Sequence, residues 1–366
     1  MRNKRLLAAA SVTVTLLTAV TACASSSPSA TDGAAGAKKP KIGVILPDSK
    51  SSVRWETADR PYLAAAFKAA GVDYDIQNAE GDKQAFQTIA DQMITSGVDV
   101  LVIVNLDSGT GKAVLDKAKA QGVATIDYDR LTLGGSAQYY VSFDNTEVGK
   151  LQGQGLAQCL SDVGAKTPVV AELNGSPTDN NATLFANGYN SVLDPKYASG
   201  EYAKGPNQPV PDWDNAQAGI IFEQMFTSQP NIAGVLAAND GLANAAIAVL
   251  RKNHRNGQVP ITGQDATVQG LQNILAGDQC MTVYKAVKKE ADAAAAMAID
   301  LAHGKKGQAA ATAHDPVGNR DVPAALLTPV AVFKKNIQDV VNDGFVSKTD
   351  LCTGSYAALC ADAGIK

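Results

Sequence analysis

Val100-Leu101-Val102-Ile103-Val104 is a run of five apolar residues, and this run decides the fold class. A strand that is apolar on both faces is typical of the centre of a parallel sheet, because helices cover both faces of such a sheet. Helical spacing precedes the run at 82–96 and follows it at 111–120. A strand between two helices indicates βαβ units, so we expect an α/β protein with a parallel sheet.

The alternation of strand and helix continues outward from this run and begins again after Asp144. The further strands are expected at 42–46, 72–77, 123–127, 168–173, 232–236, 261–262 and 281–284, and the further helices at 55–70, 146–160, 180–193, 215–227, 239–251 and 287–301. A late strand-like segment at 324–333 could cross between the two halves. The chain has 366 residues, more than one core usually organises, so we predict two doubly wound parallel-sheet lobes.

The N-terminal segment predicts secretion. Arg2, Lys4 and Arg5 precede an apolar run from 6 to 20, which is too short to span a bilayer. Val20-Thr21-Ala22-Cys23 resembles the lipobox of bacterial lipoproteins, which implies a signal peptide at 1–22 and lipid on Cys23. Residues 23–40 are rich in Ser, Ala, Gly and Pro and are expected to form a flexible linker. The alternative is an ordinary signal peptide that is cut elsewhere, with Cys23 discarded.

Charge and motifs exclude several function classes. The formal net charge is -4 and no basic face with interleaved aromatic residues is present, so we expect no nucleic-acid partner. Gly109-Thr110-Gly111-Lys112 lacks the first glycine and the final Ser/Thr of a P-loop. The cysteines and histidines form no close cluster, so we expect no metal and no cofactor.

Four cysteines remain after Cys23, and three pairings of them are possible. Outside the cytosol such an even set favours disulfides over free thiols. Cys352 and Cys360 are close in sequence and make the easiest pair, which leaves Cys159 with Cys280.

Polar side chains follow nearly every predicted strand. Any one of them is ordinary for a helix cap or a loop, but the carboxyl ends of parallel strands meet at one edge, where ligands bind. Asp, Asn and Arg side chains present paired polar atoms that suit adjacent hydroxyl groups. The two tryptophans, Trp55 and Trp213, stand near these residues and could cover an apolar ring face, although burial in a helix start is the alternative. The combination predicts a small polyhydroxylated ligand.

Several motifs together resemble one family. They are Lys41-Ile42-Gly43-Val44-Ile45, Arg54-Trp55, Tyr128-Asp129-Arg130, Ser142-Phe143-Asp144-Asn145, Gly175-Ser176-Pro177-Thr178-Asp179-Asn180-Asn181, Gly263-Gln264-Asp265 and Met281-Thr282-Val283-Tyr284-Lys285. These are similar to motifs of the ribose-type periplasmic binding proteins of ABC transporters, and most of all to the members that bind D-xylose or several monosaccharides. The resemblance covers nearly all of 41–346. The flanks of Trp213 and the tail around Cys352 and Cys360 depart from the family pattern.

The resemblance implies a type I periplasmic binding protein fold, with two lobes joined by a three-strand hinge and a cleft that closes on one monosaccharide. The N-terminal lobe would comprise 41–145 and 287–328, and the C-terminal lobe 146–286 and 329–366. The residues implied to hydrogen-bond the sugar are Arg54, Arg130, Asn181, Asn239, Asp265 and Lys285. Trp55 and Trp213 would cover the ring faces, Asp129 would orient Arg130, and Asp179 would support or join these contacts.

We therefore expect an extracytoplasmic, lipid-anchored and monomeric binding protein of a sugar ABC importer that is not an enzyme. D-xylose is the favoured ligand, and a membrane permease with its ATPase is the expected partner. Glucose, galactose and arabinose remain alternative ligands, and a sensor kinase remains an alternative partner. A glycosidase with Asp179 and Asp265 as its carboxylate pair is the rival from another class.

Overall fold

The computed structural model describes residues 39–366. The predicted signal peptide, the predicted lipid site at Cys23 and the linker up to residue 38 lie outside the described residues. Within 39–366, no helix combines the length and the apolar character that crossing a membrane would require.

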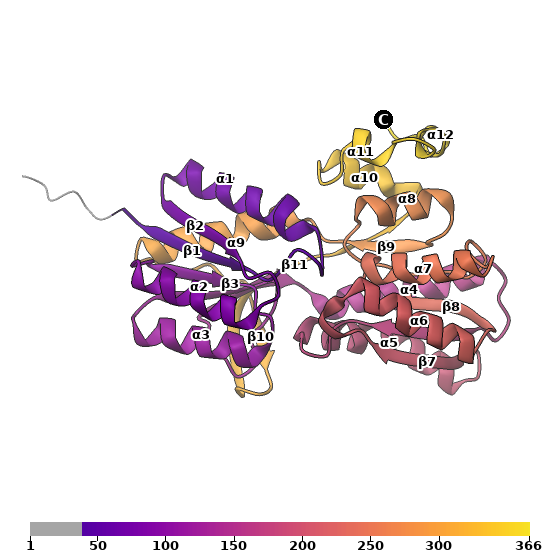
Figure 1. Ribbon diagram of the computed structural model, residues 1–366, viewed down its shortest axis with the longest axis horizontal. Helices are drawn as coiled ribbons and strands as arrows, with labels where there is room; N and C mark the ends of the chain where they lie inside the picture. Colours follow the sequence, from indigo (N-terminus) through magenta and orange to yellow (C-terminus); the bar gives the residue numbers. More distant parts are fainter. Residues whose placement is uncertain (1–38) are drawn as a thin grey trace, which may run out of the picture. The chain divides into compact units, whose positions relative to one another are not determined.

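The first sheet has seven strands and belongs to the N-terminal lobe (Figure 1). Its order is β10 (Ala311–Asp315), β11 (Arg320–Leu327), β5 (Tyr139–Phe143), β4 (Ala124–Tyr128), β3 (Val100–Ile103), β1 (Lys41–Leu46) and β2 (Asp73–Asn78). All neighbours are parallel except β10 and β11. The apolar run that opened the sequence analysis is thus a central strand, with β1 on one side and β4 on the other.

Side chains of successive strand residues leave this sheet on opposite faces, and each face has its own helices. Ile42 and Val44 join the core beneath α1 (Arg60–Ala70) and α9 (Val287–Ala302), whereas Ile45 joins the core beneath α2 (Lys83–Thr95) and α3 (Ser108–Ala120). Leu63 and Phe67 of α1 are fully buried, and each such side chain contributes about 1.5–3 kcal/mol of burial energy. The sheet is therefore doubly wound.

The second lobe contains a three-stranded parallel sheet with the order β7 (Ala203–Pro209), β6 (Val169–Asn174) and β8 (Ile232–Ala237). Its helices are α4 (Asn145–Asp162), α5 (Asn180–Ala198), α6 (Asn215–Ser228) and α7 (Asp240–Lys252), which pack as the pairs α4–α5 and α6–α7. The segment 261–265 extends this sheet, because Ile261 bridges to Val235 and accepts a hydrogen bond from the Cys280 amide at 2.9 Å. Beyond it, β9 (Met281–Tyr284) pairs antiparallel with β12 (Val330–Phe333).

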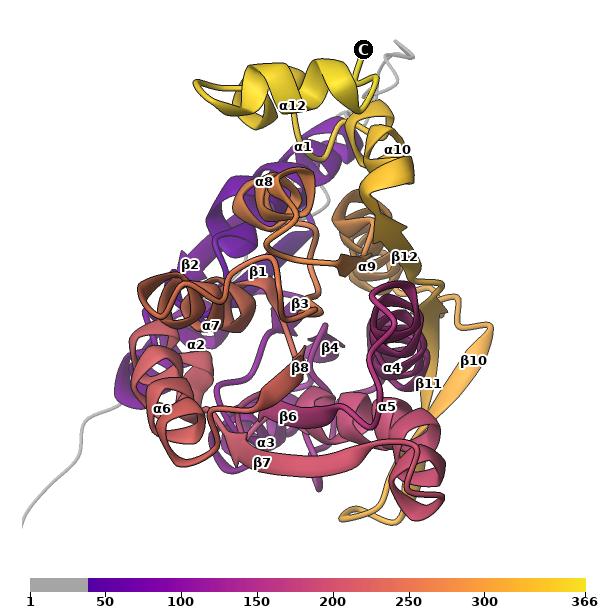
Figure 2. The ribbon, with the colours of Figure 1, turned by 90° about the vertical axis from the view of Figure 1, so that its right-hand side faces the viewer.

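The C-terminal segment covers this end of the second lobe. After β12 come the 3-10 helix η3 (Lys334–Asn336), α10 (Ile337–Asn342), α11 (Lys348–Leu351) and α12 (Tyr356–Asp362). Both α11 and α12 pack on α8 (Val268–Ala276), and Figure 2 shows α12 at the same end of the lobe as α8. Leu271, Leu351 and Ile365 are buried in one apolar cluster. A disulfide joins Cys352 to Cys360.

The chain passes between the lobes three times. The first crossing is at Asp144, between β5 and α4, and the second is at Lys285 and Ala286, between β9 and α9. The third lies at 328–329, between β11 and β12. The Asp144 amide donates to the Leu327 carbonyl at 2.9 Å, so the first and third crossings lie side by side. This arrangement confirms the predicted two lobes and three-strand hinge.

Several elements differ from the sequence predictions. The segment predicted as one strand at 324–333 is two strands, β11 and β12, which belong to different sheets. The segment 261–262 forms an isolated bridge rather than a strand. The helix predicted from Trp55 begins as a π-helix, η1 (Trp55–Asp59). The sequence pattern did not predict β5, β7, β10, α8 and the three C-terminal helices.

The second disulfide joins Cys159 at the end of α4 to Cys280 just before β9. Its partners are 121 residues apart in sequence, whereas Cys352 and Cys360 are separated by 8 residues. A bond that closes a longer loop removes more conformational freedom from the unfolded chain. The Cys159–Cys280 bond should therefore contribute more to stability.

We predict that C159A/C280A lowers the free energy of unfolding by about 5 kcal/mol and C352A/C360A by about 2.5 kcal/mol, as loop-closure entropy requires. Urea unfolding of both double variants beside the unchanged protein measures the difference. Equal losses, or a larger loss in C352A/C360A, would contradict this ranking.

Candidate functional site

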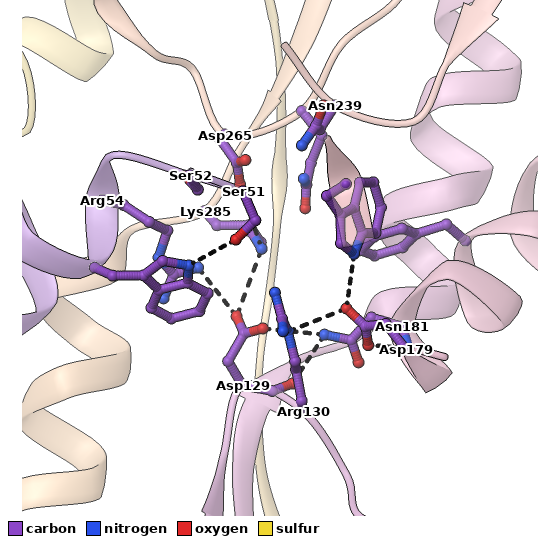
Figure 3. A pocket seen from close by; sticks show the side chains of 14 residues that line it. Ser51, Ser52, Arg54, Asp129, Arg130, Asp179, Asn181, Asn239, Asp265 and Lys285 are labelled. Atoms are coloured by element: carbon purple, nitrogen blue, oxygen red, sulfur yellow. Dashed lines mark hydrogen bonds and ion pairs between the residues drawn. The ribbon is translucent and has the colours of Figure 1, made fainter. Parts of the chain in front are cut away.

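Fourteen side chains from both lobes surround one cavity, with about 340 Å³ of space not filled by protein atoms (Figure 3). They are Ser51, Ser52, Arg54, Trp55, Asp129, Arg130, Asp179, Asn181, Phe185, Trp213, Asn239, Gln264, Asp265 and Lys285. The lining residues mostly follow the carboxyl ends of strands, which is where ligands bind in open α/β sheets. All ten residues that the sequence analysis named for the site are among them.

The backbone is strained around this cavity. Asp129 has a φ of 61°, Asp265 of 101° and Trp213 of 55°, although none of them is glycine. A left-handed conformation of a non-glycine residue costs about 1–3 kcal/mol and persists only where the surroundings hold it. Such residues cluster at ligand sites, so the strain agrees with a functional role for the cavity.

Arg54 is the centre of a buried ionic cluster in the N-terminal lobe. Its Nε and Nη2 donate to both carboxylate oxygens of Asp59 at 2.9 and 2.8 Å. Nη2 also donates to Glu290 at 2.6 Å, and Nη1 donates to Asp129 at 3.0 Å. These bonds use four of the five N–H groups of the guanidinium. Arg54 therefore has one Nη1 hydrogen left for a ligand.

The pKa values of two acids beside Arg54 are shifted in opposite directions. Burial would raise the pKa of Asp129, but the positive charges of Lys285, Arg54 and Arg130 lower that pKa to about 2. Burial raises the pKa of Glu290 to about 8, although Arg54 opposes the shift. Asp129 is therefore a carboxylate at neutral pH, whereas Glu290 is largely protonated there.

Two contacts join the lobes across the cavity. Asn181 at the start of α5 donates to the Asp129 carbonyl at 3.0 Å and to its carboxylate at 3.1 Å. Arg130 Nε lies 3.1 Å from the Asp179 carboxylate. Since Asp129 and Arg130 follow β4 whereas Asp179 and Asn181 follow β6, these contacts exist only when the two lobes are close together.

Lys285 connects the crossing segment to both sides of the cavity. Its Nζ lies 3.6 Å from the Asp129 carboxylate and 3.4 Å from that of Asp265. Lys285 stands on the second crossing itself, directly after β9. The ammonium therefore links the position of the hinge to the charges that line the cavity.

The two tryptophans are held by hydrogen bonds at their ring nitrogens. Trp55 donates to the Ser51 hydroxyl at 3.2 Å, and Trp213 donates to the Asp179 carboxylate at 3.1 Å. Both indoles are buried and both line the cavity. Asp179 also accepts a hydrogen bond from the Asn181 backbone amide and pairs with Arg130, so both of its carboxylate oxygens have partners within the protein.

Trp213 depends on a glycine. A Cβ atom at Gly175 would lie 2.0 Å from the Cη2 atom of the Trp213 ring, a distance that no side chain allows. Phe185 of α5 meets the same indole edge to face, with ring centroids 6.3 Å apart. The position of this ring is therefore fixed by both the strand end and the helix.

Five residues here were not among those expected to form the site. Four of them line the cavity, Ser51, Ser52, Phe185 and Gln264, and the fifth, Glu290, binds Arg54 behind it. Phe185 follows Asn181 by one helical turn, so its spacing on the predicted helix could have placed it beside the cavity. Glu290 shares the buried stripe of α9 with Val287, Ala291 and Ala294. An acid on an otherwise apolar stripe was the available signal, because such a charge needs a buried partner.

A comparison with known proteins identifies the family of this chain. Residues 42–306 match the periplasmic binding protein domain. The chain belongs to the periplasmic binding protein family. Its relatives are binding proteins, so this periplasmic binding protein holds its substrate without converting it, and the glycosidase alternative is excluded.

Two curated relatives cover most of the chain. The D-xylose-binding periplasmic protein of Escherichia coli (strain K12) is 37% identical over 323 residues, which are 88% of this chain and 95% of that protein. The multiple sugar-binding periplasmic receptor ChvE of Rhizobium radiobacter is 34% identical over 329 residues, 86% of this chain and 92% of that protein.

Solved structures agree with the fold. An ABC transporter solute binding protein from Clostridium phytofermentans with bound β-D-glucose has a TM-score of 0.78 at 27% identity, covering 85% of this chain and 99% of that chain. A carbohydrate transporter solute binding protein from Chloroflexus aurantiacus in complex with D-glucose has a TM-score of 0.77 at the same identity. It covers 85% of this chain and 98% of that chain. The predicted type I fold of this periplasmic binding protein is thereby confirmed.

We predict that Gly175→Ala displaces the Trp213 indole, since the new methyl group would overlap the ring. In a Trp55→Phe background, Trp213 is the one remaining tryptophan, and its fluorescence emission should shift to longer wavelength as the ring gains contact with water. Gly219→Ala is the control, because a Cβ there meets nothing within 4 Å. Identical emission from the Gly175→Ala and Gly219→Ala variants would contradict the packing argument.

We also predict that Glu290→Gln reduces the pH dependence of stability. The folded state holds a proton on Glu290 between its ordinary pKa of 4.5 and the raised pKa of about 8, so stability falls as pH rises through that window. One such group contributes at most about 1.4 kcal/mol per pH unit. Asp127 and Asp240, whose pKa values burial raises to about 7, act in the same direction and keep part of the slope.

Urea unfolding between pH 5 and pH 8 measures this slope. The surface variant Asp292→Asn on the same helix is the control, because Asp292 is half exposed beside Lys288. A slope that is the same in Glu290→Gln and in the unchanged protein would show that Glu290 does not carry the proton.

Proposed function

We propose that the protein captures one monosaccharide, D-xylose before others, in the cavity between its lobes and delivers it to an ABC permease. The observation that carries the proposal is the lining of the cavity: amides, carboxylates and cations converge there with two buried indoles. Sugar hydroxyls need such donors and acceptors, and the C–H faces of a sugar ring pack well on aromatic rings.

The proposed contacts follow from the atoms that the protein itself leaves available. Asn239 uses its side-chain oxygen to cap α7, accepting from the Leu242 amide at 2.9 Å, and its NH₂ group can donate to a hydroxyl. Arg54 offers one Nη1 hydrogen, and Asp265 and Lys285 offer an acceptor and a donor. Gln264 has a buried side-chain oxygen that makes no hydrogen bond to any residue in 39–366.

Closure of the lobes would complete the site. Arg54 and Arg130 follow strands β1 and β4 of the seven-stranded sheet. Asn181 and Asn239 follow β6 and β8 of the other sheet, and Asp265 ends the segment that extends it. A ligand that contacts both sets favours the closed state by its differential affinity. We propose that the permease recognises this closed state and that rotation occurs near 144–145, 286 and 328–329.

The similarity to a D-xylose-binding protein at 37% identity supports xylose as the first ligand to test. Glucose and galactose remain alternatives, because a relative at 34% identity binds multiple sugars and two structural neighbours hold glucose. The additional hydroxymethyl group of glucose can change the binding free energy by about 1–3 kcal/mol in a pocket that fits one of the two sugars.

We further propose that the protein is a monomer outside the cytoplasm, anchored by lipid at Cys23. The basis is the sequence Val20-Thr21-Ala22-Cys23 and the family match, which supports an extracytoplasmic place. Cys23→Ala should release the protein from the membrane fraction, and unchanged membrane association would overturn the anchor. A sensor kinase as partner, instead of a permease, would leave the sugar site as proposed.

Calorimetry of the purified protein with D-xylose, D-glucose, D-galactose and L-arabinose tests the proposed function. We predict that Asp265→Asn weakens binding about 10- to 150-fold, the worth of one hydrogen bond to a charged group. Asn is preferred to Ala because it better tolerates the φ of 101°. Asp321→Asn, an exposed carboxylate beside His314, is the matched control.

Two results would count against the proposal. Unchanged affinity in Asp265→Asn would remove Asp265 from the site while leaving the protein a sugar binder. No binding of any of the four sugars would overturn the monosaccharide function itself.

A further inference from the structure

A second compartment, with about 1440 Å³ of space not filled by protein atoms, adjoins the cavity described above. The two share Ser51, Ser52, Arg54, Asn239 and Asp265 as a common wall. This outer compartment reaches the surface, because the side chain of Val53, which lines it, is 61% exposed. A ligand in the inner cavity would therefore have further space on one side.

Three parts of the chain build the outer compartment. Thr57 and Tyr62 come from η1 and α1 of the N-terminal lobe, and Asn244 and Gln269 from α7 and α8 of the other lobe. Phe345, Val346 and Asp350 come from the C-terminal segment that packs on α8. That segment carries the Cys352–Cys360 bond, and Gln272 donates to the carbonyls of Asp350 and Leu351. The C-terminal segment is therefore held in place as a wall of this compartment.

The chemistry of the lining suits a second sugar ring. Its polar groups are mainly neutral amides and hydroxyls, and two aromatic side chains, Tyr62 and Phe345, stand among them. Its charged residues are two cations and two acids, Lys50, Arg54, Asp265 and Asp350, so no net charge selects an ion. Neutral hydrogen-bonding groups beside aromatic rings fit an uncharged polyhydroxylated molecule.

Two polar side chains of this compartment are available to a ligand. The Ser52 hydroxyl oxygen, on the common wall, is buried and makes no hydrogen bond to any residue in 39–366. The exposed Asn215 amide lies against Gly241, where a Cβ would approach its oxygen to 2.4 Å. A side chain at 241 would require the exposed Asn215 amide to move, so Gly241 leaves room for that amide beside the compartment.

We infer that the outer compartment holds the second ring of a disaccharide whose first ring occupies the inner cavity, so that the ligands include short oligosaccharides as well as monosaccharides. The inference rests on the proposed function for the inner cavity. The outer compartment has about 1440 Å³ of space not filled by protein atoms, against about 340 Å³ in the inner cavity, and the two meet at side chains that can contact both rings.

Calorimetry with D-xylose and with β-1,4-xylobiose tests the inference on the purified full chain. We expect the two dissociation constants to lie within tenfold of each other. Thr57→Trp fills part of the outer compartment from the N-terminal lobe. It should weaken the binding of xylobiose at least tenfold while changing the affinity for xylose less than twofold. Gln269→Trp, from α8 of the other lobe, should act in the same way.

Thr88→Trp is the matched control. Thr57 and Thr88 are both exposed helix residues whose hydroxyls donate to the carbonyl four residues earlier, at 2.9 and 2.8 Å, but Thr88 lies on α2 and does not line the compartment. The Thr88→Trp variant should bind both sugars as the unchanged protein does. Circular dichroism of each variant checks that it is folded.

The outcomes separate the two proposals. Xylose binding with xylobiose more than tenfold weaker overturns the disaccharide inference and leaves the proposed function intact. Tight xylobiose binding that neither Thr57→Trp nor Gln269→Trp weakens also overturns it, because the second ring must then lie elsewhere. Binding of neither sugar overturns the inference together with the xylose assignment, and the wider sugar panel then decides the monosaccharide function.

Discussion

The carboxylate of Asp129 is the point on which the site depends. It accepts from Arg54 at 3.0 Å and from Asn181 at 3.1 Å, and it lies 3.6 Å from the Lys285 ammonium. These partners come from the loop after β1, from the start of α5 and from the second crossing between the lobes. One buried acid thus joins both lobes and the hinge, and its left-handed backbone shows that the surrounding contacts hold it in place.

Glu290 completes the charge balance around Asp129. Arg54 faces three acids, Asp59, Asp129 and Glu290, which would leave excess negative charge in a buried place if all were ionised. The raised pKa of Glu290 removes part of that excess, because this acid retains its proton at neutral pH, whereas the lowered pKa of Asp129 keeps that acid ionised. The site is therefore arranged so that cations face the cavity while a neutral acid stands behind them.

The sequence predicted the parts of the fold that depend on periodic apolar residues. Val100 to Val104 and the helices beside it have strong patterns, and they occur where expected. The missed strand β7 (Ala203–Pro209) reads Ala-Lys-Gly-Pro-Asn-Gln-Pro, which has no apolar alternation, and only an edge position allows its prolines. The break between β11 and β12 at 328–329 depends on tertiary structure, because β11 pairs with β5 in one sheet and β12 pairs with β9 in another. Similarly, strand-end residues such as Asp265 could be listed from the sequence, but the long-range partners of Arg54, 75 and 236 residues away, could not.

The Cys159–Cys280 bond restricts how the two lobes can move against each other. Cys159 belongs to α4, which begins at Asn145 directly after the first crossing, and Cys280 precedes β9, which ends at Tyr284 directly before the second crossing. Two of the three connections between the lobes are thus covalently tied to each other on the same side of the hinge. The proposed rotation of one lobe against the other would have to be absorbed by the few torsion angles between these anchored elements and the opposite sheet. The C-terminal lobe would then move as one rigid body.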